Sequence, residues 1–152
     1  MLPLAINLSV FICTILSIVG DRPANRTLHY IFKPLTMCIL IAALMASDLS
    51  GNVFGYWLLA GLIFSLIGDV FLMLPTNRFI AGLVSFLIAH LAYIAAFSHY
   101  YQGSFTWWWA LPLVLFALVY YRLLAEGLGK LRLPVAGYMA VIIVMVWMAG
   151  EL

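Results

Sequence analysis

Residues 55–74 read GYWLLAGLIFSLIGDVFLML and residues 79–99 read FIAGLVSFLIAHLAYIAAFSH, two apolar runs separated by the short segment PTNR. A helix of about 20 residues crosses the roughly 30 Å hydrocarbon core of a bilayer. Pro and Asn between two such runs mark a tight turn. We therefore expect a pair of antiparallel transmembrane helices here.

Four more apolar runs surround this pair, near residues 2–20, 31–47, 106–121 and 133–150. Of the 152 residues, 67% are hydrophobic and 8% are charged, and the mean hydropathy is +1.18. Soluble domains carry about 25% charged residues, so this composition excludes a soluble globular domain. Seven Lys and Arg residues are too few for a nucleic-acid-binding surface. We expect an all-α, polytopic transmembrane bundle of about six helices, forming a single domain over residues 1–152.

The basic residues fall in alternate loops of this arrangement. They flank the first, third and fifth loops, and the second and fourth loops contain neither Lys nor Arg: Arg22, Arg26, Lys33, Arg78, Arg122, Lys130 and Arg132. The positive-inside rule assigns such loops to the cytoplasm. Both termini should then lie outside, in a multi-pass protein of the cell membrane (the inner membrane, if bacterial).

One carboxylate, that of Asp69, lies inside an apolar run. The other four acidic residues fall at helix ends: Asp21, Asp48, Glu126 and Glu151. An acid at the centre of a membrane helix costs roughly 2.5–3.5 kcal/mol on insertion scales, so Asp69 indicates a functional site. The alternative is an interfacial aspartate that reaches water or pairs with a nearby cation. Gly61, Ser65 and Asp69 recur every four residues, which predicts a face that approaches another helix closely.

His90 lies near the middle of the fourth run. Phe86, His90 and Tyr93 share one face of this helix, beside a face of small residues: Gly82, Ser85, Ala89, Ala92 and Ala96. We expect Ser65 or Tyr93 to hydrogen-bond the imidazole. His90 is then either a packing residue or a proton donor and substrate-orienting group beside Asp69.

Two further polar residues lie near the cytoplasmic side. Lys33 and Pro34 open the second run, as Arg132 to Pro134 open the sixth. Lys33 either extends to the interface or serves as a cation for a phosphate head group or for Asp69. Tyr138 is a candidate for lining the same cavity. Because Lys33, Asp69 and His90 lie at related depths, we hypothesise one cavity open to the inner leaflet.

Several of these segments, in this order and spacing, resemble the YhhN family, which contains the lysoplasmalogenases. They are FKPLTM at 32–37, GLIFSLIGDVFLM at 61–73, AHLAYI at 89–94 and GYM at 137–139. The resemblance maps Lys33, Asp69, His90 and Tyr138 onto motif positions. The family pattern continues for about two more helices, with a second aspartate motif near the end of the seventh, so the resemblance implies a shortened form.

The resemblance implies hydrolysis of the vinyl ether bond of lysoplasmalogens to a fatty aldehyde and a glycerophospho-ethanolamine or -choline. Asp69 would then act as acid and base with help from His90, Lys33 would hold the phosphate, and Ser65, Tyr93 and Tyr138 would contact the substrate. No metal or other cofactor is expected, and membrane lipids and a lysophospholipid are the expected partners. Two alternatives stay open: a small membrane transporter or lipid-binding protein without catalysis, and an inactive, shortened family member.

Overall fold

The computed structural model describes residues 4–20, 26–47, 49, 51–74, 78–101, 103, 106–125 and 127–152. These residues form six α-helices, with a short 3₁₀ segment η2 (Gly129–Leu131) before the last: α1 (Leu4–Gly20), α2 (Arg26–Met45), α3 (Val53–Met73), α4 (Phe79–Tyr100), α5 (Trp107–Ala125) and α6 (Arg132–Gly150). The prediction of an all-α fold with six helices is confirmed within this part of the chain.

The helix boundaries agree with the expected runs within two residues, except at the start of α2 and at the end of α5, which continues to Ala125. Helix α2 begins at Arg26, not near residue 31, so Lys33 and Pro34 lie about two turns inside it. The expectation that they open the helix is therefore wrong. Pro34 lacks an N–H and removes one helical hydrogen bond, a loss that membrane helices tolerate where neighbouring groups compensate. In α6, by contrast, Arg132 does begin the helix.

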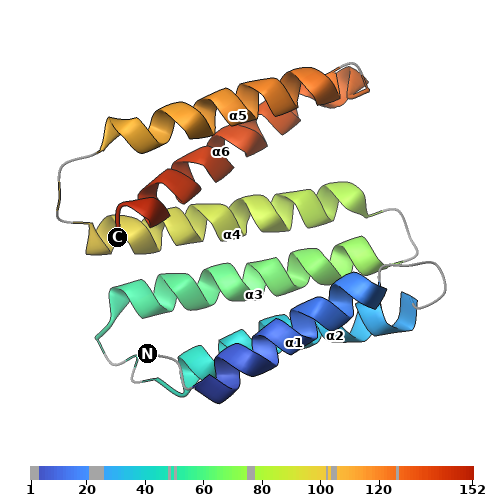
Figure 1. Cartoon of the computed structure of the whole chain (residues 1–152), viewed down its shortest axis with the longest axis vertical. Coiled ribbons are helices and arrows are strands. Elements are labelled where there is room, and N and C mark those ends of the chain that lie inside the picture. The colour runs from blue at the N-terminus through green and yellow to red at the C-terminus, as the bar shows by residue number, and fades with distance from the viewer. Residues whose placement is uncertain are drawn as a thin grey trace.

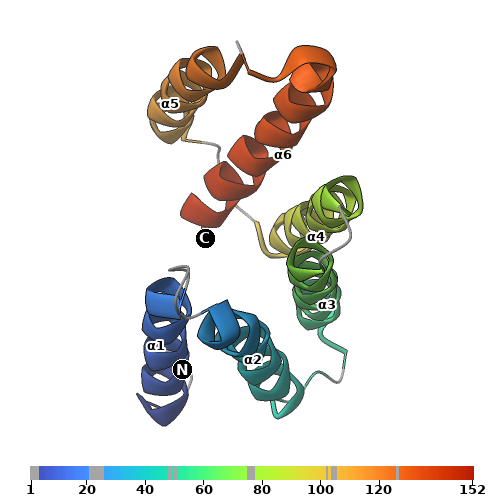
Figure 2. The same cartoon turned by 90° about the vertical axis from the view of Figure 1, so that its right-hand side faces the viewer.

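Successive helices run in opposite directions and form an open arc (Figures 1 and 2). Along this arc the order is α1, α2, α3, α4, α6, α5, and each helix packs against the next one in that order. Neighbours along the arc are also neighbours in sequence, except at one place where α4 packs against α6. These two helices run in the same direction, and α5 lies on the far side of α6 (Figure 2).

The start of α1 and the end of α6 lie at one end of the bundle. The ends of α1, α3 and α5 lie at the other end, together with the starts of α2, α4 and α6 (Figure 1). Arg26, Arg78, Arg122 and Arg132 stand at or near these latter helix termini. Among the described residues, the arginines thus gather at one end, as the charge pattern predicts. The assignment of that end to the cytoplasm stays a prediction.

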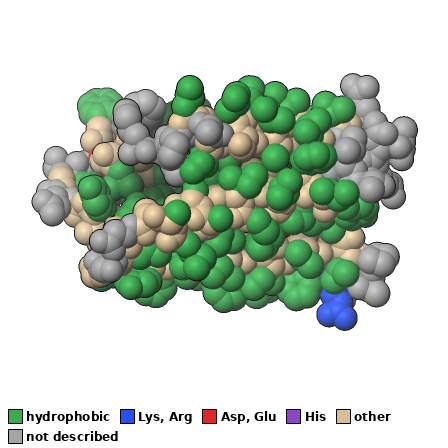
Figure 3. Space-filling view, turned by 90° about the horizontal axis from the view of Figure 1, so that it is seen from below, with side chains coloured by type: hydrophobic (Ala, Val, Ile, Leu, Met, Phe, Trp, Pro, Cys, Tyr) green, Lys and Arg blue, Asp and Glu red, His purple; other side chains and the backbone are tan. Residues whose placement is uncertain are grey.

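The outer surface of the helices is apolar. α3, α4 and α6 are each long and apolar enough to cross a membrane, and shorter apolar segments occupy Ile6–Val19, Tyr30–Met45 and Ala110–Ala125. Large apolar side chains such as Phe11, Leu115 and Phe116 are more than half exposed. Figure 3 shows such side chains along the length of one face, with a basic group at one end. In a membrane protein these side chains contact lipid chains.

The most closely packed interface, between α3 and α4, consists of small residues. The buried residues of the two helices are those whose spacing predicted close approach, together with Gly55 and Gly68: Gly61, Ser65 and Asp69 on α3, and Gly82, Ser85, Ala89, Ala92 and Ala96 on α4. Each of three glycines faces a large side chain of the other helix: Gly61 faces Tyr93, Gly68 faces Phe86 and Gly82 faces Leu72. All three pairs fit one antiparallel register, because a residue a given number of positions later in α4 faces a residue the same number of positions earlier in α3.

Glu151 connects the two ends of the α5–α6 hairpin. Its carboxylate accepts hydrogen bonds from the backbone N–H and the hydroxyl of Thr106, both at 3.0 Å. The indole N–H of Trp147 donates to the Thr106 carbonyl at 3.4 Å. Desolvation, and then the negative charge of Glu151, raise the pKa of the nearby Tyr101 hydroxyl. These contacts fix the start of α5 against the end of α6.

Replacement of Gly61 by Ala is expected to lower the free energy of unfolding by about 1–3 kcal/mol, the usual cost of overpacking. A Cβ at this position would overlap the Tyr93 ring. Gly137→Ala is a matched control in α6, because nothing lies within 4 Å of the position that its Cβ would take. Thermal unfolding in detergent compares the two variants, and equal melting temperatures would contradict the proposed packing.

Candidate functional site

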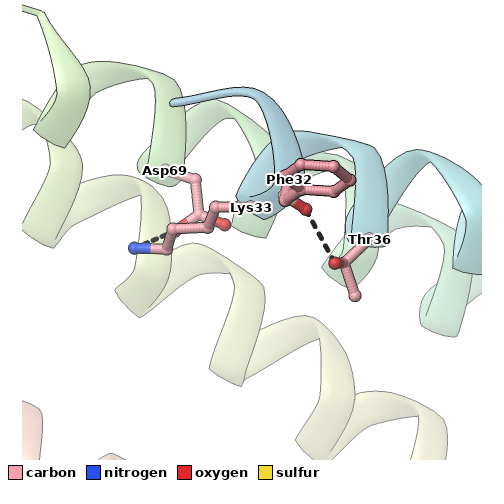
Figure 4. A network of polar contacts seen from close by, with 4 residues as sticks. All are labelled: Phe32, Lys33, Thr36 and Asp69. Carbon is pink, nitrogen blue, oxygen red and sulfur yellow. Dashed lines mark hydrogen bonds and ion pairs between the residues drawn. The ribbon is translucent and has the colours of Figure 1, made fainter. Parts of the chain in front are cut away.

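An ion pair between α2 and α3 forms the centre of the site. The Lys33 Nζ lies 2.9 Å from Asp69 Oδ1, and the exposed fractions of the two side chains are 34% and 8%. Figure 4 shows Lys33 extending from α2 toward the Asp69 carboxylate on α3, while the Thr36 hydroxyl bonds the Phe32 carbonyl one turn away. Asp69 thus lies on the buried face of α3. Its cation is Lys33 on the preceding helix, as the sequence suggested.

The lysine has capacity for a second anionic partner. An ammonium group carries three N–H donors, and one contact with Asp69 Oδ1 uses one of them. About a third of the side chain remains exposed. Lys33 can therefore contact Asp69 and an incoming phosphate at the same time, which combines the two functional roles expected for it.

Ser65 and Tyr93 bond to each other across the α3–α4 interface. Their hydroxyl oxygens lie 3.1 Å apart. Ser65 stands one helical turn before Asp69, and the Tyr93 ring lies over Gly61. The expectation that one of these hydroxyls bonds His90 is wrong, because the ring of His90 bonds a backbone carbonyl instead.

His90 instead bonds the backbone of its own helix. Its Nδ1 contacts the carbonyl oxygen of Phe86, one turn earlier. A carbonyl can only accept a hydrogen bond, so Nδ1 carries a proton and the neutral ring presents the lone pair of Nε2. Residue types alone did not identify the Phe86 carbonyl as the partner, although a carbonyl four residues earlier is a known acceptor for polar side chains on a helix.

The imidazole ring lies between two tyrosines. Its centroid is 6.4 Å from that of Tyr93 on α4 and 5.5 Å from that of Tyr138 on α6, and both pairs meet edge to face. Tyr138 thus reaches the site through the packing of α6 against α4, two helices that are not adjacent in sequence. The sequence suggested Tyr138 as a cavity residue, but nothing in its spacing identified His90 as its neighbour.

The six candidate residues therefore form three pairs, and each pair joins two of the four helices α2, α3, α4 and α6. Lys33 pairs with Asp69, Ser65 with Tyr93, and His90 with Tyr138. In the α3–α4 register His90 lies level with Phe64, five residues from Asp69, which is about 7 Å along the helix axis. Within the described part of the chain, no group of three His, Cys, Asp or Glu residues is placed to hold a metal ion.

Removing Lys33 should destabilise the protein more than removing both charges. Lys33→Met leaves the Asp69 carboxylate buried without its cation, which costs about 3–5 kcal/mol in buried pairs. The double variant Lys33→Met/Asp69→Leu should recover most of this loss. Unfolding in detergent measures both, with Arg78→Met at the exposed start of α4 as the control for loss of one positive charge. A double variant as unstable as Lys33→Met would show that the pair is not coupled.

The fold and the site define a class of protein. Helices able to cross a bilayer, an apolar outer surface and an ion pair between two helices describe a multi-pass membrane protein. The sequence pattern of the YhhN family matches residues 28–152, and the chain belongs to that family.

The curated relatives carry the same family name. The chain is 34% identical over 126 residues to proteins named "Uncharacterized membrane protein YhhN" from Escherichia coli O6:H1 and Escherichia coli O157:H7, and to one from Shigella flexneri. The match covers 82% of this chain and 59% of each relative, so the chain spans about three fifths of their length. No solved structure matches the chain.

Proposed function

We propose that the protein hydrolyses the vinyl ether bond of lysoplasmalogens within the membrane. The observation that carries this proposal is the Lys33–Asp69 pair, a buried carboxylate held by a cation between membrane helices. Charged groups at such depth are expensive and most often functional. The resemblance to lysoplasmalogenases supplies the reaction, and Lys33 provides a contact for the phosphate of the head group.

The reaction requires two proton-transfer groups and a water molecule. A proton is transferred to the β-carbon of the vinyl ether, and the double bond becomes an oxocarbenium ion. Water adds to the cationic carbon, and the hemiacetal then collapses to an aldehyde and the glycerol hydroxyl. Glycosidases meet the same cationic intermediate with two acid–base groups on either side of the reacting carbon.

Asp69 and His90 can divide these roles. In its protonated form, Asp69 delivers a proton to the β-carbon while the phosphate of the substrate contacts Lys33. The resulting carboxylate stabilises the oxocarbenium ion, and His90 Nε2 accepts a proton from the attacking water. The imidazolium then protonates the departing ether oxygen while Asp69 takes the hemiacetal proton, so both groups return to their starting states.

Asp69→Asn should abolish release of aldehyde by the purified protein in detergent supplied with lysoplasmenyl-ethanolamine. Asparagine keeps the shape of the side chain but cannot donate the proton. Glu151→Gln removes a carboxylate at the other end of the bundle and should retain activity. Equal aldehyde release by Asp69→Asn and the unchanged protein would refute the role of Asp69. If only a chain extended to the length of the relatives is active, the site needs residues beyond position 152.

His90→Gln should lower the rate by roughly 10²–10⁴-fold, the usual contribution of a positioned acid–base group. His99→Gln is the matched control, because His99 lies exposed in the last turn of α4. Initial rates of aldehyde release compare the two variants. A similar loss of rate in both would indicate a general effect of removing a histidine.

The three polar pairs, which join α2, α3, α4 and α6, also support proton transfer across the bundle without hydrolysis. A transporter of this kind should carry protons with a solute into liposomes under an imposed gradient. The hydrolase should release aldehyde in detergent without any gradient. Proton flux that Asp69→Asn abolishes, with no aldehyde from any vinyl ether lipid, would favour transport over hydrolysis.

A further inference from the structure

An apolar groove lies between α5 and α6, and Phe79 and Leu83 near the start of α4 also line it. Its volume is about 470 Å³, which is within the usual range of ligand pockets. Apart from the hydroxyls of Tyr120 and Tyr138, every lining side chain is a hydrocarbon or a thioether. Of the three polar pairs, only His90–Tyr138 has a member, Tyr138, among the residues that line the groove.

The length of the groove matches one leaflet of a bilayer. Its lining residues run from Leu113 to Leu124 on α5 and from Val135 to Val146 on α6. Eleven residues of helix span about 16 Å, which is half of the roughly 30 Å hydrocarbon core. A groove of this length, parallel to helices that cross the membrane, has the direction and extent of a single lipid chain.

The groove adjoins the site at Tyr138. This residue lines the groove, and its ring meets the His90 ring at 5.5 Å. The bond that the proposed reaction breaks is the one between a long hydrocarbon chain and a polar glycerol head. A substrate of this shape needs an apolar channel on one side of its reacting carbons and polar groups on the other, and Tyr138 stands where the two meet.

We propose that this groove binds the single hydrocarbon chain of the lysolipid substrate and sets the chain length that the protein prefers. The identity of the substrate rests on the proposed function, whereas the binding of a hydrocarbon chain in the groove does not depend on it. Val146 and Leu113 line the groove at the end of the bundle where the termini lie, so bulk at these positions shortens the space available to the chain.

Photolabelling of the purified protein tests the groove directly. The probe is a saturated ether lysophosphatidylethanolamine with a diazirine in its chain, which has no vinyl ether to hydrolyse. Label should concentrate in peptides of α5 and α6 and should be displaced by unlabelled lysolipid but not by diacyl phosphatidylethanolamine. Label spread over lipid-facing residues, or displaced equally by the diacyl lipid, would overturn the proposal in favour of ordinary bilayer contact.

Two matched pairs of variants locate the chain. Val146→Phe should reduce labelling several-fold and shift the preferred chain to shorter members of a series differing by two carbons. Val144→Phe, two residues away and outside the groove, should change neither. On α5, Leu113→Phe inside the groove and Leu111→Phe outside it form the same comparison. This second pair serves if a variant of α6 fails to fold. Equal effects within both pairs would overturn the assignment of the groove.

The two proposals fail separately. Specific labelling of the groove without aldehyde release from any vinyl ether lysolipid would retain the chain site and reject the hydrolase. Aldehyde release, together with labelling that does not change when Val146 or Leu113 is replaced, would retain the hydrolase and reject this groove as its chain site.

Discussion

The close approach of α3 and α4 is the contact on which the rest of the structure depends. Glycines at 61, 68 and 82 remove side-chain volume where large groups of the other helix must lie. Without a hydrophobic driving force between helices in lipid, such shape matching is the main source of affinity. The same packing places Tyr93 over Gly61 beside Ser65 and excludes lipid from Asp69, so stability and the candidate site share one interface.

Much of this arrangement could be predicted from residue spacing. Apolar runs of about 20 residues have one stable form in a bilayer, and five of the six helices begin close to where the runs begin. The small residues of α3 and α4 recur at helical spacing, and they are the buried ones. Asp69 could be singled out because an acid within an apolar run is costly, and Lys33 because it belongs to the run directly before that of Asp69.

Other features depend on contacts that spacing does not encode. The start of α2 at Arg26 was missed because Pro34 suggested a helix beginning, although a membrane helix accommodates proline in its interior. The partner of His90 was misassigned because a nearby backbone carbonyl competes with the side chains of other helices. The packing of α4 against α6, and with it the groove and the contact of Tyr138 with His90, follows from which helices meet, and apolar helices leave that choice open.

The order of the helices along the arc also bears on how the protein assembles during synthesis. Lys33 enters the membrane on the helix immediately before Asp69, so the carboxylate meets its counter-ion as soon as α3 inserts. The α3–α4 hairpin then completes the Ser65–Tyr93 contact. The His90–Tyr138 contact forms after the other two pairs, because Tyr138 lies on α6, the last helix of the described chain. Charge is therefore neutralised early in biogenesis, before the contact between the polar site and the apolar groove can form.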